Sequence, residues 1–450
     1  MNDDQSRVHV DPATTRKDSV KTEVGSVFVS NYPPYSFWNS QDVEKALEAF
    51  GQPASQSPLG FYLHIPFCRK RCKFCYFKVY TGKNSSEIQS YLDGLAAEFE
   101  TYARQPAVLG RPLKFIYFGG GTPSFISVKH LQWLTERLKD NFDTRTVSEF
   151  AFECEPGTLT ASKLEAIREV GVSRLSLGVE HFDDRILADN GRAHTSTEIY
   201  RVWPWIKEMD FEQVNIDLIA GMVGESESSW MAAVEKAIEL EPDSVTIYQL
   251  ELPYNAIYSQ SIRDGNPEHL VVADWETKRR WHSMAIDRFL AAGYDISSAY
   301  TLVRRNGKTQ QFLYRDALWR GSDMLATGVA SFGHINGVHF QNSSSWAEYL
   351  ETAHAGALPV KRAYATTPQE RFVREMILQM KLGYLSPSYF SDKFGVDILS
   401  HFAGQWAHLK GEGMLDFSPE KITLSRSGLL QVDQLLPLFY EEKYRNSRYT

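Results

Sequence analysis

The sequence has little cysteine, no long apolar segment and no excess of positive charge. Only four cysteines occur among 450 residues, and three of them fall within eight residues, at Cys68, Cys72 and Cys75. Secreted disulfide frameworks are spaced differently, so a reducing compartment and a metal site explain them better. No stretch reaches the roughly 18 apolar residues of a membrane helix, and the polar first 26 residues lack a signal-peptide core. We therefore expect a cytoplasmic protein that does not span a membrane.

The charge balance argues against a protein that binds nucleic acid. Lys and Arg number 48 against 56 Asp and Glu, which gives a formal net charge of −8. Neutralising phosphates requires a basic face. Residues 361–450 suggest a winged helix, but they hold 12 Lys and Arg against 10 Asp and Glu and show no basic stripe. We expect this part to serve as a substrate lid or to pack against the rest of the protein.

Strands and helices alternate from about residue 60 to about residue 300. Amphipathic helices separate the strands; after Ser127, for example, Leu131, Leu134 and Leu138 share one helical face and Ser127 suits an N-cap. Nearly continuous apolar strands between helices predict an α/β fold with a parallel sheet, either open or curled into a partial (β/α)6 barrel. Functional residues are then expected at the carboxyl ends of the strands. The six strand-like runs begin near residues 61, 113, 149, 174, 214 and 244.

The chain divides into four predicted parts. Residues 1–57 form a polar tail and an N-terminal extension, and residues 58–300 form the partial barrel. Residues 301–360, rich in glycine, serine and aromatic residues, are predicted to be a loop-rich segment that covers the barrel edge. Residues 361–450 are predicted to form a small helical domain with a winged-helix outline.

The strongest motif is YLHIPFCRKRCKFCYF, in which C-x3-C-x2-C follows a predicted strand, so that three thiolates can converge from one loop. Structural zinc usually takes four protein ligands. No fourth ligand has matching spacing here, because Cys154 stands alone on a predicted strand and His64 precedes the loop. A sulfur site with one vacancy favours a 4Fe–4S cluster that keeps one iron open for a small molecule. Zinc and buried free thiols are the alternatives.

Other polar residues follow the predicted strands. The run Gly119–Gly121 lets backbone donors approach a ligand, although a tight turn explains it equally well. Glu153 and Asp217 at strand ends suit an ammonium group or ribose hydroxyls, and they suit a helix cap as well. Arg192 could hold a carboxylate, although solvated arginines are commoner. For aromatic residues such as Phe74, core packing is commoner than stacking on a cofactor.

These residues together resemble a known family. The cysteine motif resembles the radical S-adenosylmethionine (radical SAM) superfamily, and the longer string resembles the oxygen-independent coproporphyrinogen III oxidase (HemN) family. The similarity covers about residues 58–440. It extends through FGGGTPS (118–124), ECEPGTLT (153–160), RLSLGVEHFDD (174–184), NGRAH (190–194), NIDLIAGMVGE (215–225) and GSDMLATGVASFGH (321–334).

The resemblance implies cofactors, a partner and residue roles. It implies a 4Fe–4S cluster bound by Cys68, Cys72 and Cys75, and an electron donor of the flavodoxin or ferredoxin type. A first S-adenosylmethionine at the cluster would contact Tyr62, Gly120, Glu153 and Phe332. A second S-adenosylmethionine would contact Phe74, Gly121, Thr122, Glu180, Arg192 and Asp217.

Three departures separate the chain from relatives that decarboxylate coproporphyrinogen. Those relatives carry a further cysteine where this chain has Phe77, and a glutamine where it has Glu180. The N-terminal stretch VFVSNYPPYSFW also differs from their pattern. Heme chaperones lack the extra cysteine too, but their chains usually begin close to the cluster motif. In this chain about 57 residues come before that motif.

These departures favour the methyltransferase and cyclopropanase-type (class C) members of the family. Such a protein would use the second S-adenosylmethionine to methylate or cyclopropanate an sp2 carbon of a small-molecule substrate. Oxidative decarboxylation of coproporphyrinogen III and non-catalytic heme carriage are the alternatives. Candidate substrate contacts, for which packing against the sheet is the commoner role, are Tyr248, Glu251, Trp319 and Arg320.

Overall fold

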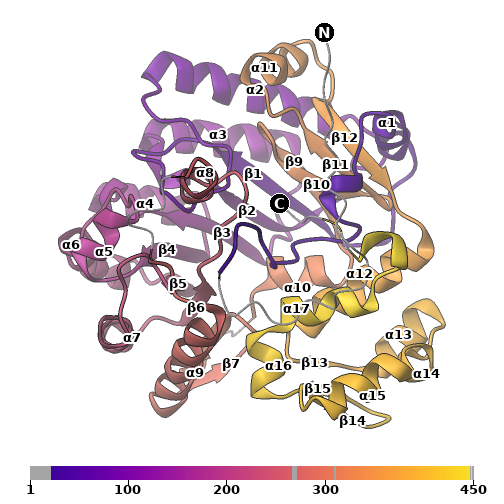
Figure 1. Ribbon diagram of the computed structural model, residues 1–450. Coiled ribbons are helices and arrows are strands. Elements are labelled where there is room, and N and C mark those ends of the chain that lie inside the picture. The colour runs from indigo at the N-terminus through magenta and orange to yellow at the C-terminus, as the bar shows by residue number, and fades with distance from the viewer. Residues whose placement is uncertain (1–21, 266–270, 309–310, 446, 448–450) are drawn as a thin grey trace.

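The six predicted strands lie side by side at the centre of the protein (Figure 1). The computed structural model describes residues 22–265, 271–308, 311–445 and 447. Each strand pairs in parallel with the next one along the chain, so the prediction of a parallel sheet is confirmed. The strands are β1 (Leu59–Ile65), β2 (Leu113–Gly120), β3 (Glu149–Cys154), β4 (Arg174–Glu180), β5 (Gln213–Ala220) and β6 (Ser244–Gln249).

Helices connect consecutive strands and cover the outer face of the sheet. The helix after Ser127 begins where the sequence predicts, because the side chain of Ser127 accepts a hydrogen bond from the backbone N–H of His130. Its Leu131, Leu134 and Leu138 are buried. The connecting helices are α2 (Ser85–Ala103), α3 (Val128–Asn141), α4 (Ala161–Glu169), α5 (Asp184–Asp189), α6 (Ser196–Glu208) and α7 (Glu227–Leu240).

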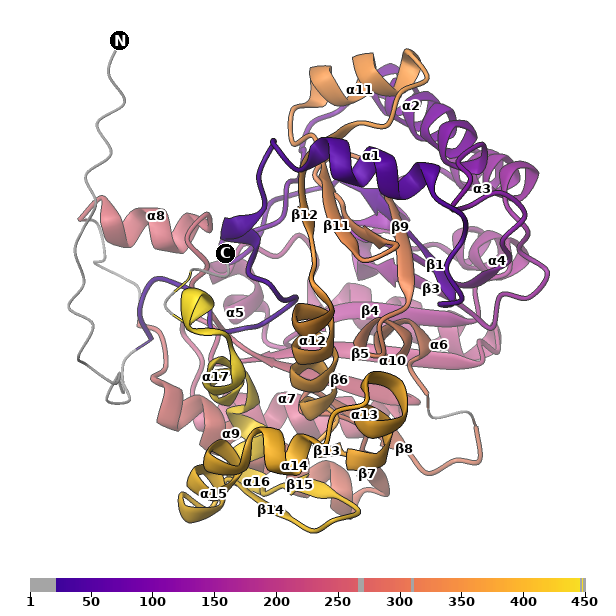
Figure 2. The same cartoon turned by 90° about the vertical axis from the view of Figure 1, so that its right-hand side faces the viewer.

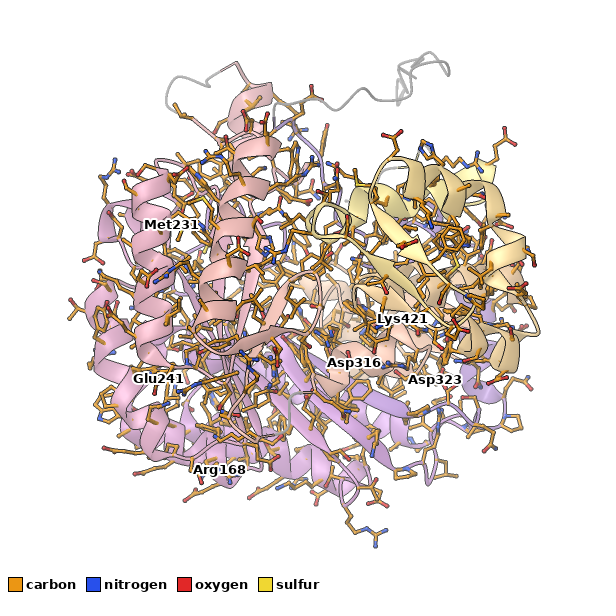
Figure 3. The ribbon with its side chains drawn as sticks, turned by 90° about the horizontal axis from the view of Figure 1, so that it is seen from below. Arg168, Met231, Glu241, Asp316, Asp323 and Lys421 are labelled. Atoms are coloured by element: carbon orange, nitrogen blue, oxygen red, sulfur yellow. The ribbon has the colours of Figure 1, made fainter. Side chains whose placement is uncertain are left out.

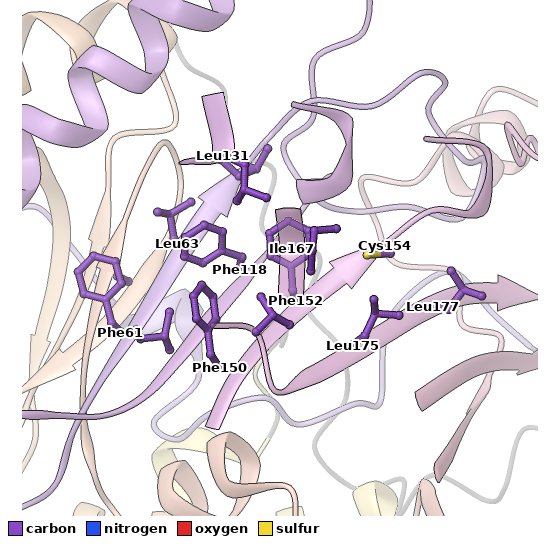
Figure 4. Close-up of a cluster of buried hydrophobic side chains, with 14 of the residues drawn as sticks. Phe61, Leu63, Phe118, Leu131, Phe150, Phe152, Cys154, Ile167, Leu175 and Leu177 are labelled. Atoms are coloured by element: carbon purple, nitrogen blue, oxygen red, sulfur yellow. The ribbon is translucent and has the colours of Figure 1, made fainter. Parts of the chain in front are cut away.

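The largest apolar core lies between the sheet and these helices. Alternate strand residues face it, and the residues between them face the interior of the barrel. Cys154 belongs to this core and is 5% exposed, which separates it from the other three cysteines (Figure 4). The strand side chains in this core include Phe61, Leu63, Phe118, Phe150, Phe152, Leu175 and Leu177, which pack with Leu131 and Ile167 of the helices (Figure 4).

Residues 301–360 are more regular than the sequence predicts. Here β9 pairs in parallel with β1, and β8 pairs antiparallel with β6, so this segment lengthens the sheet at both edges. The glycines that suggest a loop lie in tight turns: Asn336 and Gly337, with φ of 47° and 81°, join β10 to β11 as a hairpin. The elements are β8 (Thr301–Arg304), α10 (Leu313–Trp319), β9 (Asp323–Thr327), β10 (Phe332–Ile335), β11 (Val338–Asn342) and α11 (Trp346–His354).

With β7 (Tyr294–Ile296) and β12 (Val360–Ala365), the strands form one twelve-stranded sheet. Its order is β12-β11-β10-β9-β1-β2-β3-β4-β5-β6-β8-β7. The parallel strands occupy its middle, and antiparallel strands close both sides. The carboxyl ends of the parallel strands therefore share one end of the barrel.

The other end of the barrel is occupied by α10. Backbone amides of Leu313 and Tyr314 each donate to the carboxylate of Glu149, the first residue of β3, over 2.9 Å. Figure 3 views the protein from this end, with Asp316 of α10 near the start of β9. Trp319 and Arg320 lie just before β9, so they belong to the end where strands begin. The ring of Trp319 packs against the apolar core of the C-terminal domain, which fits the packing role, and substrate contact by either residue stays a prediction.

The C-terminal part forms a helical domain with a second apolar core. A three-stranded sheet of order β13-β15-β14 supplies the predicted wing. The helical region of the prediction is therefore confirmed. Its elements are α12 (Pro368–Met380), β13 (Tyr384–Leu385), α13 (Pro387–Phe394), α14 (Ile398–His401), α15 (Ala403–Gly411), β14 (Leu415–Phe417), β15 (Ile422–Leu424), α16 (Arg426–Leu430) and α17 (Val432–Leu435).

The N-terminal extension joins the barrel to the C-terminal domain. The amides of Val27 and Phe28 donate to Glu251, just after β6, and the amide of Val29 donates to Asp433 of α17 over 2.8 Å. The helix that follows, α1 (Val43–Gly51), lies beside β12 (Figure 2). The first 21 residues of the predicted polar tail lie outside the described residues. Within the described ranges, no helix combines the length and apolar character needed to cross a membrane.

Lys381 fastens the N-terminal extension to the C-terminal domain, and its removal should be costly. Its Nζ lies 2.7 Å from Asp433 Oδ1 and donates to the carbonyl of Val29, and its side chain is 1% exposed. Breaking a buried ion pair leaves one charge unpaired, which costs about 3 to 5 kcal/mol. We expect Lys381→Met to lower the free energy of unfolding by about that amount in urea titrations. The exposed Lys421→Met should change it by less than about 0.5 kcal/mol, and equal effects of the two variants would contradict the pairing.

Candidate functional site

One anchored loop between β1 and α2 carries the three clustered cysteines. The backbone amide of Cys68 donates to the carbonyl of Tyr80 over 3.1 Å, and the amide of Tyr80 donates to the carbonyl of Pro66 over 2.7 Å. All three thiols are free and partly accessible. The structure therefore presents them from one place, at the carboxyl end of β1, as the spacing predicts.

Two donors from outside the loop reach its sulfur atoms. Thr122 Oγ1 donates to Cys68 Sγ over 3.4 Å, and Arg192 Nη1 donates to Cys72 Sγ over 3.2 Å. Burial raises the pKa of the Cys68 thiol to about 11 and that of Cys75 to about 12. Such thiols are protonated until a metal supplies the compensating positive charge. Donors that point at sulfur also stabilise the thiolate form that binds metal.

The surroundings of the thiols suit an iron–sulfur cluster. In the described part of the chain, no three His, Cys, Asp or Glu side chains are grouped so that they could hold one metal ion. Zinc needs all its ligand atoms about 2.0–2.3 Å from one point, whereas each thiolate of a cluster binds an iron of its own. Gly121 keeps the neighbouring space open, because a Cβ there would lie 3.0 Å from Cys68 Sγ and 2.9 Å from the carbonyl carbon of Pro66. The donor set and the open edge fit a 4Fe–4S cluster.

A glycine edge at the end of β2 faces Glu153 on β3. Gly120 has φ 114°, and a Cβ there would lie 2.5 Å from the ring of His64, so only glycine fits. Its amide donates to Glu153 Oε2 over 3.2 Å, and the hydroxyl of Tyr117 donates to Oε1 over 2.6 Å. Burial raises the pKa of Glu153 to about 7. A cationic ligand beside this carboxyl group stabilises its charged form.

Glu180 and Asp217 add two further carboxyl groups at this end of the barrel. Burial raises the pKa of both, that of Glu180 to about 7, and their charges act on Glu153. Glu180 ends β4 with φ 64°, where the pairing with β5 shifts register. A left-handed conformation costs a residue other than glycine about 1–3 kcal/mol, and such residues cluster at ligand sites. Asp217 is oriented by the hydroxyl of Ser176, which donates to its Oδ2 over 2.8 Å.

Arg192 connects the cysteine loop to these carboxyl groups. Its Nη1 lies 3.6 Å from Glu180 Oε1 and also reaches Cys72, while its Nη2 donates to the carbonyl of Gly178 over 2.7 Å. The side chains of Arg192 and Glu180 are 12% and 13% exposed. A largely buried guanidinium with these three partners is a fixed part of the site, unlike the solvated arginine that was the alternative.

Three of the predicted ligand contacts occupy different surroundings. Tyr62 of β1 stacks on Tyr117, with ring centroids 5.9 Å apart, and so lies next to Glu153. Phe74 packs into small apolar clusters with residues such as Met222. Phe332 begins β10, and its ring centroid lies 5.3 Å from that of Tyr35 in the N-terminal extension. The roles of Phe74 and Phe332 as cofactor contacts stay predictions.

Accessible aromatic rings surround the same end of the barrel. Tyr76 and Phe77, just after the third cysteine, stack with ring centroids 4.5 Å apart and are 42% and 43% exposed. Tyr248, at the end of β6, is 41% exposed, yet burial and the charge of Asp217 raise its pKa well above the usual value. Tyr248 and the stacked pair are therefore aromatic rings that a ligand can reach, close to the carboxyl ends of β6 and β1.

Glu251, another predicted substrate contact, has structural partners. Glu251 accepts hydrogen bonds from Ser26, Val27 and Phe28 of the N-terminal extension, and burial raises its pKa to about 7. It therefore fastens the extension to the barrel, which is a packing role.

A network around Glu155 was missed by the sequence analysis. Glu155 accepts two hydrogen bonds from Arg69, of 3.0 and 2.8 Å, and lies 3.3 Å from His194 Nδ1. Burial alone would raise the pKa of Glu155, but His194 and Arg69 lower it to about 2. Because Arg69 follows the first cysteine, this pair ties the loop to the end of β3. The sequence signal was that Glu155 and His194 lie within the family motifs ECEPGTLT and NGRAH. Local sequence patterns do not predict a contact between Arg69 and Glu155, which are 86 positions apart.

Known proteins are similar to this chain in sequence along most of its length. The model of the radical SAM superfamily matches residues 62–237. The heme chaperone HemW of Bacillus subtilis is 27% identical over 391 residues, which covers 85% of this chain and 99% of that protein. The oxygen-independent coproporphyrinogen III oxidase of Pseudomonas aeruginosa is 26% identical over 400 residues, which covers 85% of each chain.

A solved structure has the same fold. Coproporphyrinogen III oxidase (HemN) of Escherichia coli, described as a radical SAM enzyme, matches with a TM-score of 0.78 at 23% identity, over 92% of this chain and 96% of that chain. These relatives are coproporphyrinogen oxidases and a heme chaperone, so the predicted closeness to methyltransferase and cyclopropanase-type members is not supported. The cofactors of a radical SAM protein are a 4Fe–4S cluster and S-adenosylmethionine. Residues 62–237 thus match the radical SAM superfamily, and most of the chain is similar to the heme chaperone HemW and to oxygen-independent coproporphyrinogen III oxidases.

Proposed function

We propose that this radical SAM protein removes a hydrogen atom from a small-molecule substrate and oxidises it in the manner of the coproporphyrinogen oxidases. The observation that carries the proposal is the convergence of three free thiols, Arg192 and three carboxyl groups at the open end of a HemN-like barrel. When bound, the cluster supplies the electron, and S-adenosylmethionine supplies the carbon radical, for this chemistry.

The residues of this chain would bind and orient these groups. Cys68, Cys72 and Cys75 would hold the cluster. The amide edge at Gly120 and the carboxyl of Glu153 would bind the amino acid and ribose parts of S-adenosylmethionine. A second molecule would lie against Glu180, Asp217 and Arg192, where acidic groups attract its sulfonium charge. Tyr76, Phe77 and Tyr248 would pack against the substrate and exclude water from the reacting atoms.

One observation favours methyl transfer as a second candidate. Phe77 stands where the resemblance places a cysteine in decarboxylating relatives, and its exposed ring stacks on Tyr76. A phenyl ring there cannot perform thiol chemistry, and it adds apolar surface for a flat substrate. A methyl-transferring enzyme would use the second S-adenosylmethionine as its methyl source.

The first prediction concerns the cluster and the cleavage of S-adenosylmethionine. Protein reconstituted with iron and sulfide without oxygen should be brown and, with dithionite, should form 5′-deoxyadenosine. We expect Cys72→Ala to lose both the colour and this product, because one thiolate ligand is gone. Cys154→Ala should keep both, because Cys154 lies in the apolar core. Product formation by Cys72→Ala would contradict the ligand assignment.

The same reaction separates the candidate functions. Carbon dioxide released from added coproporphyrinogen III, together with 5′-deoxyadenosine, would support oxidation. S-adenosylhomocysteine formed together with 5′-deoxyadenosine would support methyl transfer. A protein that forms neither product, but whose absorption spectrum changes on titration with heme, would be a carrier.

The second prediction tests the open space beside the loop. Gly121→Ala places a Cβ about 3 Å from backbone and sulfur of the loop, so we expect the loop to shift and cluster assembly to fail. The iron and sulfide content per chain after reconstitution measures this effect. Gly51→Ala is the matched control, since no atom lies within 4 Å of its added Cβ. Normal iron content in Gly121→Ala would show that the close approach is not needed.

The third prediction concerns pH. Burial raises the pKa of Glu153 to about 7, so this carboxyl becomes charged as the pH rises through neutrality. We expect the affinity for cationic S-adenosylmethionine to rise several-fold from about pH 6 to pH 8, by at most about tenfold per unit. Equilibrium dialysis with the cluster-loaded protein measures it. Glu153→Gln should flatten the rise.

The matched control for this pH dependence is Glu98. Its pKa is also raised to about 7 by burial, but its partners are Tyr349 and Asn342, on α11 and β11. Glu98→Gln should leave the pH dependence of binding unchanged. A flat profile in the wild-type protein would show that Glu153 does not bind the cationic ligand.

A further inference from the structure

A bulge in β12 determines which face of the sheet carries Arg362. On β11, Gln341 and Asn342 are adjacent residues. Their partners on β12 are Arg362 and Val360, so one extra residue, Lys361, stands between those two. Such a bulge redirects the side chain that follows it, and bulges are common at barrel rims and beside ligand sites. The bulge therefore brings the arginine opposite Gln341.

Arg362 belongs to a row of side chains at the open end of the barrel. Figure 1 shows β10, β11 and β12 side by side. Phe332 of β10 pairs with Gln341, which in turn pairs with Arg362. Neighbouring Phe340 belongs to the large apolar core beneath the helices, so the row lies on the other face of the sheet, toward the barrel interior. Because β10 runs antiparallel to β9, its first residue lies beside the carboxyl end of β9.

Tyr35 of the N-terminal extension supports this arginine. The guanidinium carbon of Arg362 lies 4.7 Å from the centroid of the Tyr35 ring. The hydroxyl of Tyr35 donates to Gln341 Oε1 over 2.7 Å. The extension is attached beside the bulge, because Asn39 and Ala363 exchange two backbone hydrogen bonds, of 3.0 and 2.9 Å. The ring is therefore held in place from two sides.

The guanidinium group of Arg362 has donors to spare. Among the residues that the structure describes, it forms no ion pair and no hydrogen bond, although its side chain is partly buried. The adjacent Lys361 is exposed and is paired with Glu348. A guanidinium that lies on an aromatic ring keeps the N–H donors at its edge available, in a fork that matches the two oxygens of a carboxylate. The arrangement therefore suits a carboxylate ligand.

Positive and negative charge are separated at this end of the barrel. Glu153, Glu180 and Asp217 lie on β3, β4 and β5. Arg362 lies on β12, and β1, which carries the cysteine loop, stands between these two groups in the sheet order. When charged, the three acidic groups repel a carboxylate, whereas the arginine attracts it. A ligand with one anionic end is therefore favoured in one orientation.

We propose that Arg362, supported by Tyr35, binds a carboxylate of the substrate and so orients the substrate in the barrel. This inference rests on the proposed function and adds to it the chemical class of the substrate. That class is an organic anion whose carboxylate lies at β12 and whose apolar part contacts the exposed rings of Tyr76, Phe77 and Tyr248. The carboxylate of S-adenosylmethionine is the other group that such a site could hold, so the test distinguishes the two.

The test compares an acid with its ester. Coproporphyrin III, the stable oxidised form of coproporphyrinogen III, carries carboxylates, and its methyl ester carries none. Both fluoresce, so their binding to the cluster-loaded protein can be titrated in the same low concentration of detergent. We expect Arg362→Gln to weaken binding of the acid by about tenfold or more, because charge-assisted hydrogen bonds are lost. Binding of the ester should stay within about threefold.

Two further variants sharpen this comparison. Lys361→Gln is the matched control, because it removes the same charge at the adjacent residue, whose side chain is paired with Glu348. It should change binding of neither compound. Arg362→Lys keeps the charge without the fork, so we expect it to recover part of the affinity for the acid. Iron content per chain after reconstitution should be equal in all variants, which shows that each one folds.

Three results would overturn the proposal. The first is acid binding by Arg362→Gln that equals that of the wild-type protein, or an equal loss of acid and ester binding. The second is a wild-type protein that binds neither compound. The third concerns S-adenosylmethionine, whose affinity from equilibrium dialysis should be unchanged in Arg362→Gln. A fall in that affinity by about tenfold would assign the arginine to the carboxylate of the cofactor instead.

The proposed function and the role of Arg362 fail in different ways. If dithionite supports no cleavage of S-adenosylmethionine in the wild-type protein, the proposed function fails and the role of Arg362 falls with it. If dithionite supports cleavage but Arg362→Gln still binds the acid as tightly as the wild-type protein, only the role of Arg362 is overturned.

Discussion

The guanidinium group of Arg192 is the interaction on which the rest of the site depends. It bonds Cys72 on the loop, the carbonyl of Gly178 on β4, and approaches Glu180 at the end of that strand. A buried cation is tolerated only where partners surround it, so these groups are drawn to one place. The left-handed backbone at Glu180 is part of the same arrangement, because it turns this carboxyl group toward the cation as the strand ends.

The sheet explains why these groups meet at one end of the barrel. Alternation along each parallel strand sends apolar side chains to the helices and polar ones to the interior, and the carboxyl ends share one rim. The opposite end is filled by α10 through its bonds to Glu149. The barrel therefore has one open end, and the cysteine loop, the acidic groups and the accessible aromatic rings all lie there.

Local patterns predicted what depends on local sequence. The apolar runs predicted the six parallel strands, and Ser127 predicted the start of α3. The cysteine spacing predicted a loop that presents three thiols together. Pairings between distant segments were not predictable in this way. The strands of residues 301–360 were missed because their glycine-rich turns look like loops, although the Asn336-Gly337 hairpin was a usable signal. The bond from Arg69 to Glu155 and the position of Trp319 depend on how the whole chain folds.

The N-terminal extension has a consequence for how the molecule is made. The amide of Val29 donates to Asp433, 404 positions later, and Lys381, just after α12, contacts both residues. A ribosome delivers Val29 404 residues before Asp433, and domains begin to fold as they emerge. The contact between the N-terminal extension and the C-terminal domain therefore cannot form until α17 has been synthesised.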